Sequence, residues 1–270
     1  MASYFAKPQE ADRPVFDLST VPEYSGEAWA PLNGNVPEFT EEELTAESYE
    51  LYGRLDHLGR CGTAMASVGL DLMPTEPRGE IGSVKPTGWH SVKHDFVDGK
   101  SLYNRCHLIG FQLTGENANE LNLITGTRYL NVEGMLPFEN MIADYVKETG
   151  NHVLYRVTPV FSEDELVARG VQLEAMSVED KGEGVSFNVY CYNVQPGVIL
   201  DYATGESSMD EAAFTEGEQH DYVLNTSSKK FHLPDCSGAQ SMSAKNRQDY
   251  TGTREMLIAQ GFEPCSSCKP

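Results

Sequence analysis

The chain has 270 residues, 40% of them hydrophobic and 10% aromatic, so it can bury a core and is not disordered throughout. This length predicts one large domain or two unequal ones. No apolar run approaches the ~18 residues that a membrane-spanning helix needs. With 20 basic and 41 acidic residues the formal net charge is −21, which by itself argues against a nucleic-acid partner, because phosphate binding favours a basic surface.

The N-terminal part of the chain is predicted to be an extended arm followed by a helix. Residues 1–39 are rich in Pro, Gly, Ser and acidic residues. Thr40 to Glu43 form a capping-box pattern and leucines follow at helical spacing, which predicts a helix over roughly 41–57. The first residues lack the apolar stretch of a secretory signal, so the protein is either cytosolic or has had such a signal removed.

The middle of the chain predicts an antiparallel sheet. Residues 151–161, 171–178 and 185–194 alternate in polarity and are rich in β-branched and aromatic residues. Short Gly-containing segments separate them. We therefore expect consecutive antiparallel strands inside a main domain that spans residues 40–200.

The last seventy residues divide into a linker and a small module. Residues 201–221 hold seven acidic residues and no Lys or Arg, which is typical of a solvated linker. Residues 222–270 have their own helix signal over 253–260, closed by Gly261. They hold six basic and four acidic residues, which allows a weak phosphate-facing role but better fits an ordinary solvated surface.

This module contains a cysteine and histidine pattern with the spacing of a metal site. The pattern consists of His232-x3-Cys236 and Cys265-x2-Cys268, which predicts a structural, tetrahedral Cys3His zinc site. A disulfide is the alternative, but three cysteines would leave one unpaired. The segment resembles a small zinc-binding tail appended to bacterial secreted hydrolases and nucleases.

The residues with the most reactive chemistry lie between 103 and 139. Arg105 and His107 stand two apart, so they would share one face of a strand. A guanidinium can bind a phosphate while an imidazole takes a proton from water. Asn131 and Glu139 offer the hard oxygen ligands that Mg2+ accepts.

The order and spacing of these residues match a known signature. Asn104-Arg105-Cys106-His107 is followed by Asn122-Leu-Ile-Thr125. Asn131 lies nine residues after Asn122, and Glu139 eight residues after Asn131. Over roughly residues 50–200 the sequence resembles the DNA/RNA non-specific endonucleases, a ββα-metal family. Residues 77–89 resemble the same region of a Gram-positive secreted branch of it.

The resemblance implies a function and a role for each matching residue. It implies an α+β fold, with a ββα-metal core on an antiparallel sheet, and Mg2+-dependent, sequence-non-specific hydrolysis of DNA and RNA. It makes His107 the general base and Arg105 a stabiliser of charge on the scissile phosphate. Asn131 would be the direct ligand of a hydrated Mg2+, and Glu139 would hold a metal-bound water. The resemblance also implies a bacterial, secreted or cell-surface enzyme, with no obligate protein partner.

Two residues depart from the signature. Asn104 stands where the family has Asp, so a carboxylate that orients the base must come from elsewhere. Cys106 stands where the family has Gly. It could pair with Cys61 or Cys191, or remain a buried reduced thiol, which is the simpler state.

The metal site and the substrate contacts keep alternatives. Pro137 predicts that the helix carrying Asn131 and Glu139 is kinked or begins there. Glu133 or Glu148 could then replace Glu139. The candidate substrate contacts, which could equally be solvated charges or core aromatics, are Arg128, Lys85 and Lys93 for phosphates and Trp89, Tyr103 and Tyr129 for bases.

Two other function classes stay open at this stage. One is a non-catalytic nucleic-acid-binding or adhesion protein that uses the zinc module, and the other is a metal- or thiol-based redox protein. The acidic balance does not exclude a nuclease, because it is concentrated in residues 1–60 and 201–221. Residues 78–131, which carry most of the signature, hold six basic and five acidic residues.

Overall fold

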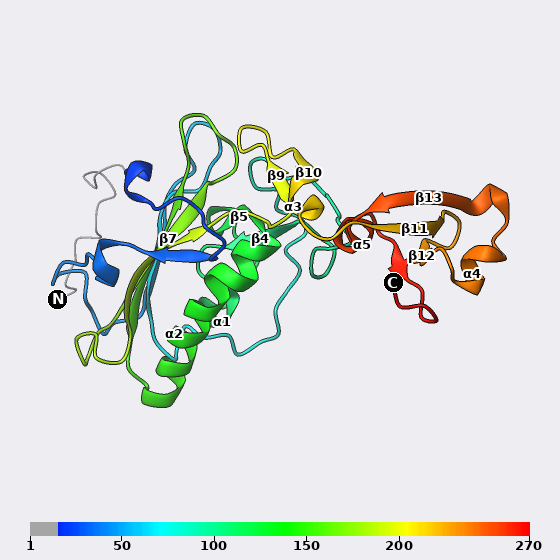
Figure 1. Cartoon of the computed structure of the whole chain (residues 1–270). Coiled ribbons are helices and arrows are strands. Elements are labelled where there is room, and N and C mark those ends of the chain that lie inside the picture. Colours follow the sequence, from blue (N-terminus) through cyan, green and yellow to red (C-terminus); the bar gives the residue numbers. More distant parts are fainter. Residues whose placement is uncertain (1–15) are drawn as a thin grey trace, which may run out of the picture. The chain divides into compact units, whose positions relative to one another are not determined.

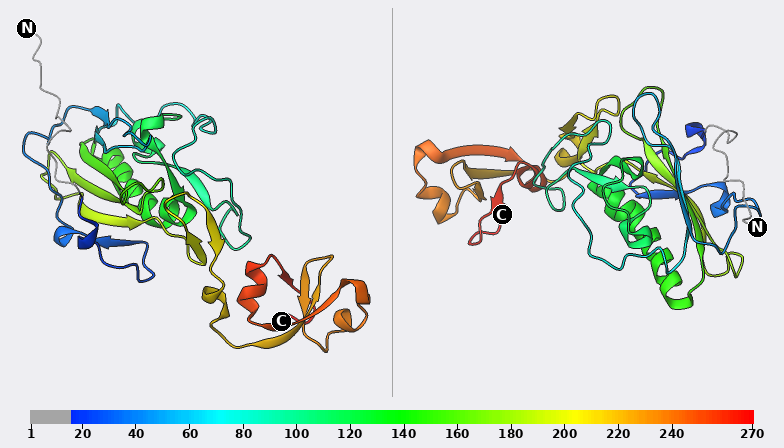
Figure 2. Two further views of the ribbon diagram at one scale, coloured as in Figure 1. Left: turned by 90° about the horizontal axis from the view of Figure 1, so that it is seen from above. Right: turned by 180° about the vertical axis from the view of Figure 1, so that it is seen from behind.

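The computed structural model describes residues 16–270, which fold as two compact units (Figures 1 and 2). The first unit comprises the described residues up to His90, with Tyr103–Val194 and Asp201–Glu206. The second comprises Ser91–Leu102, Gln195–Leu200 and Ser207–Pro270. Both units are therefore discontinuous in sequence.

A six-stranded antiparallel sheet forms the centre of the first unit. Its strand order is β1-β8-β7-β6-β3-β2. The strands are β1 (Trp29–Pro31), β2 (Tyr49–Tyr52), β3 (Ala64–Val68), β6 (Val153–Val160), β7 (Gly170–Ser177) and β8 (Ser186–Tyr192). The three antiparallel strands predicted between residues 151 and 194 are confirmed as β6, β7 and β8.

Helix α2 (Leu136–Thr149) covers one face of this sheet (Figures 1 and 2). Its buried side chains, among them Ile142 and Val146, form one apolar cluster with alternate residues of β6, β7 and β8, such as Tyr155. Since neighbouring residues on a strand face opposite sides, this cluster uses every second strand residue. The helix ends at Gly150, which has a left-handed backbone (φ 73°).

The opposite face of the sheet is covered by the segment before β2. This differs from the predicted extended arm, since Trp29–Pro31 pairs with β8 as an edge strand. Leu32 and the partly buried Phe16 pack on Tyr190. Apolar residues are scattered through the segment and can cover the sheet. The overall composition of the segment, which is polar, does not show this. Residues 1–15 of the predicted arm lie outside the described residues.

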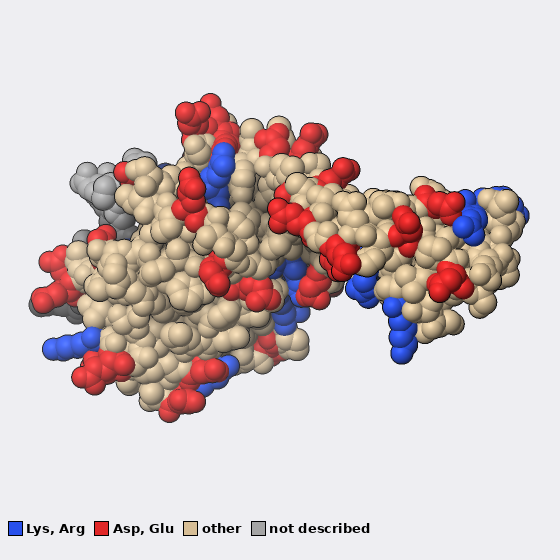
Figure 3. All heavy atoms as spheres, viewed as in Figure 1, with Lys and Arg blue, Asp and Glu red and all other residues tan. Residues whose placement is uncertain are grey.

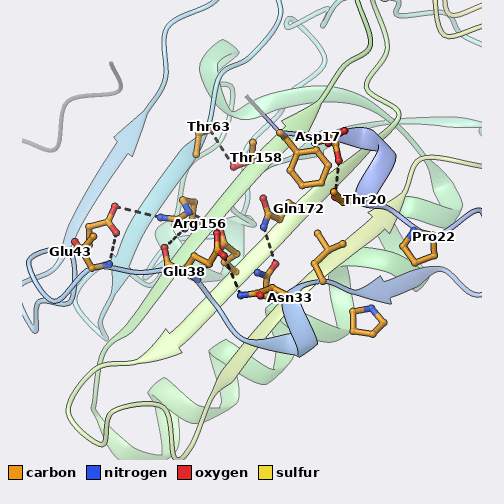
Figure 4. Close-up of a pocket in the computed structure, with 16 residues that line it drawn as sticks. Asp17, Thr20, Pro22, Asn33, Glu38, Glu43, Thr63, Arg156, Thr158 and Gln172 are labelled. Atoms are coloured by element: carbon orange, nitrogen blue, oxygen red, sulfur yellow. Dashed lines mark hydrogen bonds and ion pairs between the residues drawn. The ribbon is translucent and has the colours of Figure 1, made fainter. Parts of the chain in front are cut away.

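A polar cavity of about 830 Å3 lies on this face, and the Arg156 side chain binds acidic residues that line it (Figure 4). The buried Arg156 guanidinium donates to the Glu174 carboxylate at 2.7 Å and to the Glu38 carbonyl at 2.8 Å. It also lies 3.4 Å from Glu43 and over the Phe39 ring. The network therefore fastens residues 38–43 to the sheet.

The helix predicted over 41–57 is wrong. Glu43 does accept the Thr40 N–H at 3.0 Å, as a capping box requires, but only a turn follows. Residues 49–52 form β2, which pairs with β3. The aromatic pair Tyr49 and Tyr52 favours a strand, and sheet pairing outweighs the leucine spacing.

The second unit is a small module built on another sheet. The strands β13 (Arg247–Gly252), β11 (His220–Asn225), β12 (Lys230–His232) and β14 (Glu263–Pro264) lie in that order, with β12 and β14 parallel. The predicted helix is confirmed as α5 (Arg254–Ala259), capped by Thr253. Two further short elements of this unit are α4 (Ser237–Gln240) and a 3-10 turn, η6 (Ala244–Asn246).

The acidic segment 201–221 is not a continuous solvated linker. It contains β10 (Ser207–Met209), which pairs with β9 (Val198–Leu200), then α3 (Ala212–Thr215) and the start of β11. Phe214 of α3 packs on Phe96 at a ring distance of 4.9 Å. A few apolar residues order the segment despite its charge.

Acidic side chains are widespread on the face drawn in Figure 3, with fewer Lys and Arg among them. Among residues 16–270, no helix combines the length and apolar character needed to cross a bilayer.

Candidate active site

Two strands and a helix carry the signature residues of the first unit. Strand β4 (Tyr103–His107) pairs antiparallel with β5 (Leu123–Thr127) as a separate two-stranded ribbon. A π-helical turn, η5 (Leu130–Met135), then leads directly into α2. Pro137 lies at the junction where the π-helical turn gives way to α2, so the helix that carries Asn131 and Glu139 is irregular at this point.

The connection between β4 and β5 contains α1 (Phe111–Thr114) and a 3-10 turn, η4 (Glu120–Asn122). A buried asparagine in η4 fixes the conformation of this connection. The Asn122 side chain accepts the Ile109 N–H at 2.9 Å and donates to the Ile109 carbonyl at 3.0 Å. The first residue of the second signature segment is thus structural. It sets the chain direction directly after His107.

His107 is buried, and its two ring nitrogens have different partners. Nε2 lies 2.9 Å from the Asn117 carbonyl, which can only accept, so Nε2 carries the hydrogen. Nδ1 then accepts from the Arg78 guanidinium at 3.3 Å. Burial, together with the positive charge of Arg78, lowers the pKa of His107. The imidazole is therefore neutral at neutral pH, with its basic nitrogen facing a cation.

Asn117 holds both the imidazole and the segment that carries Arg78. Its backbone carbonyl binds His107, and its side-chain oxygen accepts the Gly79 N–H at 2.6 Å. The predicted need for another group to orient the base, given Asn104, is therefore met by a backbone carbonyl rather than a carboxylate.

Asn131 lies on the first turn of η5, against the face of β4 that carries Asn104 and Cys106. Its Nδ2 donates to Asn104 Oδ1 at 3.0 Å, and its Oδ1 accepts from the Cys106 thiol at 3.1 Å. Asn104 therefore contacts the predicted metal ligand rather than the base. Cys106 fits in the ribbon because residue 126 is Gly, where an added Cβ would lie 2.7 Å from the Cys106 Cβ.

Glu139 is buried in the first turn of α2, with its carboxylate against the backbone of Gly110. A Cβ at position 110 would come within 2.4 Å of this carboxylate, so a larger residue there would displace the Glu139 carboxylate. Burial raises the pKa of Glu139 to about 7, although the Gly110 N–H and the charge of Arg78 both act to lower it. The two alternative acids, Glu133 and Glu148, are exposed.

Arg105 binds a loop of its own unit. Its guanidinium lies 4.1 Å from the centre of the Trp89 ring, and it donates to the Val84 and Gly82 carbonyls. Arg105 and Trp89 therefore hold the loop over residues 82–89, and the indole face that was a candidate for base stacking is covered by Arg105.

The other predicted contacts do not gather at His107. Lys85 lines a separate cavity of about 210 Å3 beside Cys61, and Lys93 belongs to the second unit. The hydroxyl of buried Tyr103 donates to the Gly205 carbonyl, and that of Tyr129 to the Gly26 carbonyl. Arg128 is half-buried between β5 and η5.

The cysteines and the predicted zinc ligands lie as follows. Cys61, Cys106 and Cys191 are buried free thiols, and the Cys61 thiol points at the Leu123 carbonyl, 3.2 Å away. The four predicted zinc ligands lie together in the second unit.

Sequence reasoning missed two residues of the site, Arg78 and Asn117. Both lie in loops outside the signature, and only the fold brings them to His107. The one available signal was that Arg78 lies in the segment 77–89, which already resembled a secreted nuclease branch.

Comparison with known proteins identifies the family. Residues 40–179, more than half of the chain, match the family model described as DNA/RNA non-specific endonuclease. The chain belongs to this family. It is therefore an enzyme of the nuclease class rather than a non-catalytic binding protein.

Solved nuclease structures share the fold. NucA from Streptococcus agalactiae with a magnesium ion bound is 27% identical, with a TM-score of 0.60 over 67% of this chain and 86% of that one. The metal-free form of the same protein is 26% identical, with a TM-score of 0.62 over 72% of this chain and 92% of that one. Sda1 nuclease with a bound zinc ion, 23% identical over 66% of this chain and 95% of that one, has a similar fold (TM-score 0.56). The α+β class and the ββα core on an antiparallel sheet are thereby confirmed.

Proposed function

We propose that this enzyme hydrolyses phosphodiester bonds of DNA and RNA with little sequence preference and depends on Mg2+. The observation that carries the proposal is the pairing of a neutral His107 with Arg78 beside the ββα element. A proton acceptor next to a fixed cation suits attack of water on an anionic phosphodiester.

In this mechanism His107 is the general base. A base must be unprotonated at the working pH, and burial next to Arg78 favours the neutral imidazole. The hydrogen bond from Nε2 to the Asn117 carbonyl leaves Nδ1 as the atom that takes the proton. The imidazolium formed would be stabilised by that same carbonyl.

In this proposal Arg78, rather than Arg105 as the resemblance implied, stabilises charge on the scissile phosphate. Its guanidinium lies 3.3 Å from His107, so a phosphate beside the base would contact it directly. Arginine suits this task because its planar donors match two phosphate oxygens. Arg105 acts by holding the loop over residues 82–89 in place.

The residues present fit a magnesium ion. Asn131 Oδ1 and the Glu139 carboxylate are hard oxygen donors from the start of one continuous helix. Glu139 is buried and has no ion pair among the described residues, so a nearby cation would stabilise its charged form. When bound, the ion supplies positive charge to the phosphate. The likeness to NucA, whose structure holds magnesium, supports this choice of metal.

The first unit has few basic residues beside many acidic ones, which favours weak, salt-sensitive binding of the substrate backbone. Backbone contacts carry no sequence information, which agrees with non-specific cleavage. Export from a bacterial cell, implied by the resemblance, stays a prediction.

A digestion assay tests the proposal. Supercoiled plasmid and an unstructured RNA are incubated with the full chain and added Mg2+, with and without EDTA. Both substrates should be cut with Mg2+ and spared with EDTA, and Asn131→Ala should raise the Mg2+ concentration needed for half-maximal cleavage. Cleavage that is equally fast in EDTA would refute the metal dependence.

A further inference from the structure

The second unit contains four side chains whose ligand atoms converge on one point. His232, Cys236, Cys265 and Cys268 place these atoms within 4.8 Å of one another. The first three residues are buried and Cys268 is half-buried. We propose that this cluster is a closed Zn2+ site, which completes the second unit and takes no part in the nuclease chemistry.

The spacing of the atoms fits tetrahedral zinc. Zn–S bonds of about 2.3 Å and a Zn–N bond of about 2.0 Å, at tetrahedral angles, place N and S about 3.5 Å apart. The distance between His232 Nδ1 and Cys236 Sγ is 3.5 Å. The geometry therefore selects Nδ1, rather than Nε2, as the histidine ligand atom.

The backbone supports both pairs of ligands. His232 ends β12, and Cys236 follows after a turn closed by its own N–H to the Leu233 carbonyl at 3.0 Å. Cys265 and Cys268 share a turn closed from the Lys269 N–H to the Cys265 carbonyl at 2.9 Å. These turns aim all four side chains at one volume.

A backbone amide also donates to one of the sulfur atoms. The Leu233 N–H donates to Cys268 Sγ at 3.4 Å. Such a donor stabilises the thiolate that zinc binds. Gly238 leaves the space open, since a Cβ there would lie 3.0 Å from the His232 ring.

The cluster lies on the face of the second unit's sheet that has few other buried apolar side chains. On one face of β11, Tyr222 and Leu224 pack with Phe231 and with Leu257 of α5. On the other face Val223, paired across the sheet with His232, meets mainly Ala239 and the ligand cysteines. Residues 222–270 are too few for a large apolar core, so a metal on this second face is a physically reasonable substitute.

Four protein ligands leave no open coordination position, which is typical of structural rather than catalytic zinc. The site is separate from Asn131 and Glu139, which belong to the first unit. Removal of zinc should therefore loosen the segments around the ligands, 230–242 and 263–270, and leave the first unit folded.

Metal analysis of the full chain, purified under reducing conditions without chelator, tests the site. We expect about one zinc per chain in the wild type and in Cys61→Ser, whose thiol is buried elsewhere, and less than a tenth of that in Cys268→Ser. A wild type that retains less than a tenth of an equivalent after incubation with Zn2+ and dialysis would overturn the proposal.

Cobalt substitution covers the case in which Cys268→Ser fails to fold. Co2+ added to the zinc-depleted wild type should give thiolate-to-cobalt charge-transfer absorption and the visible bands of a tetrahedral ion. Hydrogen exchange should quicken in 230–242 and 263–270 when zinc is removed, and recover with Zn2+. Co2+ bound without thiolate absorption, or a disulfide between two of the three cysteines in the native chain, would contradict the assignment.

Discussion

Replacing Glu139 by Gln should make the first unit more stable at alkaline pH than the wild type. Burial raises the pKa of this carboxyl from 4.5 to about 7. The unfolded chain therefore releases this proton at lower pH than the native chain does. Between these values the native state holds the extra proton, so wild-type stability falls as pH rises through the window.

The size of the effect follows from the pKa difference. A shift of roughly 2.5 units corresponds to about 3 kcal/mol, because each unit is worth about 1.4 kcal/mol. From about pH 4.5 to about pH 8 the wild type should lose about 3 kcal/mol relative to Glu139→Gln. Comparing the two proteins at both pH values cancels other titrating groups and the packing effect of the substitution.

Urea unfolding followed by tryptophan fluorescence measures the free energy of unfolding of the first unit. The chain has two tryptophans, Trp29 and Trp89, and both belong to the first unit. Added Mg2+ at about pH 8 should restore wild-type stability and leave Glu139→Gln unchanged, since binding to the native state stabilises it. Equal changes of stability with pH in the two proteins would refute the assignment of a buried, ionisable Glu139.

Three further predictions concern catalysis and the ribbon. The acid limb of the pH–rate profile should move to lower pH as Mg2+ is raised, because the ion competes with the proton on Glu139; a limb that stays fixed would contradict this. Asn117→Ala should reduce kcat about ten- to a hundredfold with a much smaller change in KM, since it frees the Gly79 segment; an unchanged kcat counts against its positioning role. Gly126→Ala should destabilise the first unit by about 1–3 kcal/mol in urea, and Cys106→Gly should recover part of that loss; additive effects would argue against the contact.

Local sequence patterns predicted much of the fold, because in several segments the pattern of apolar residues matches the way the segment packs. The strands between 151 and 194 alternate because one face meets α2, and α5 begins at a capping threonine. The helix prediction for residues 41–57 was wrong because the leucines there have helical spacing, while the pairing of β2 with β3 determines the conformation. Such pairing depends on residues far away in sequence.

The candidate site was only partly predictable for the same reason. His107, Asn131 and Glu139 are found by spacing, because one ribbon and one helix carry them at fixed separations. Arg78 and Asn117 come from loops whose positions depend on the whole fold. The signature also could not show that Arg105 is engaged with its own loop, since hydrogen bonds to backbone carbonyls leave no sequence pattern.

The most direct test of the proposed mechanism is the single-turnover rate of DNA and RNA cleavage by His107→Ala at saturating Mg2+. His57→Ala, which alters an exposed histidine of the same unit, is the matched control. Loss of the general base should slow cleavage of both substrates about 10²- to 10⁴-fold, with the control within about twofold of wild type. Cleavage by His107→Ala at the wild-type rate would contradict the account.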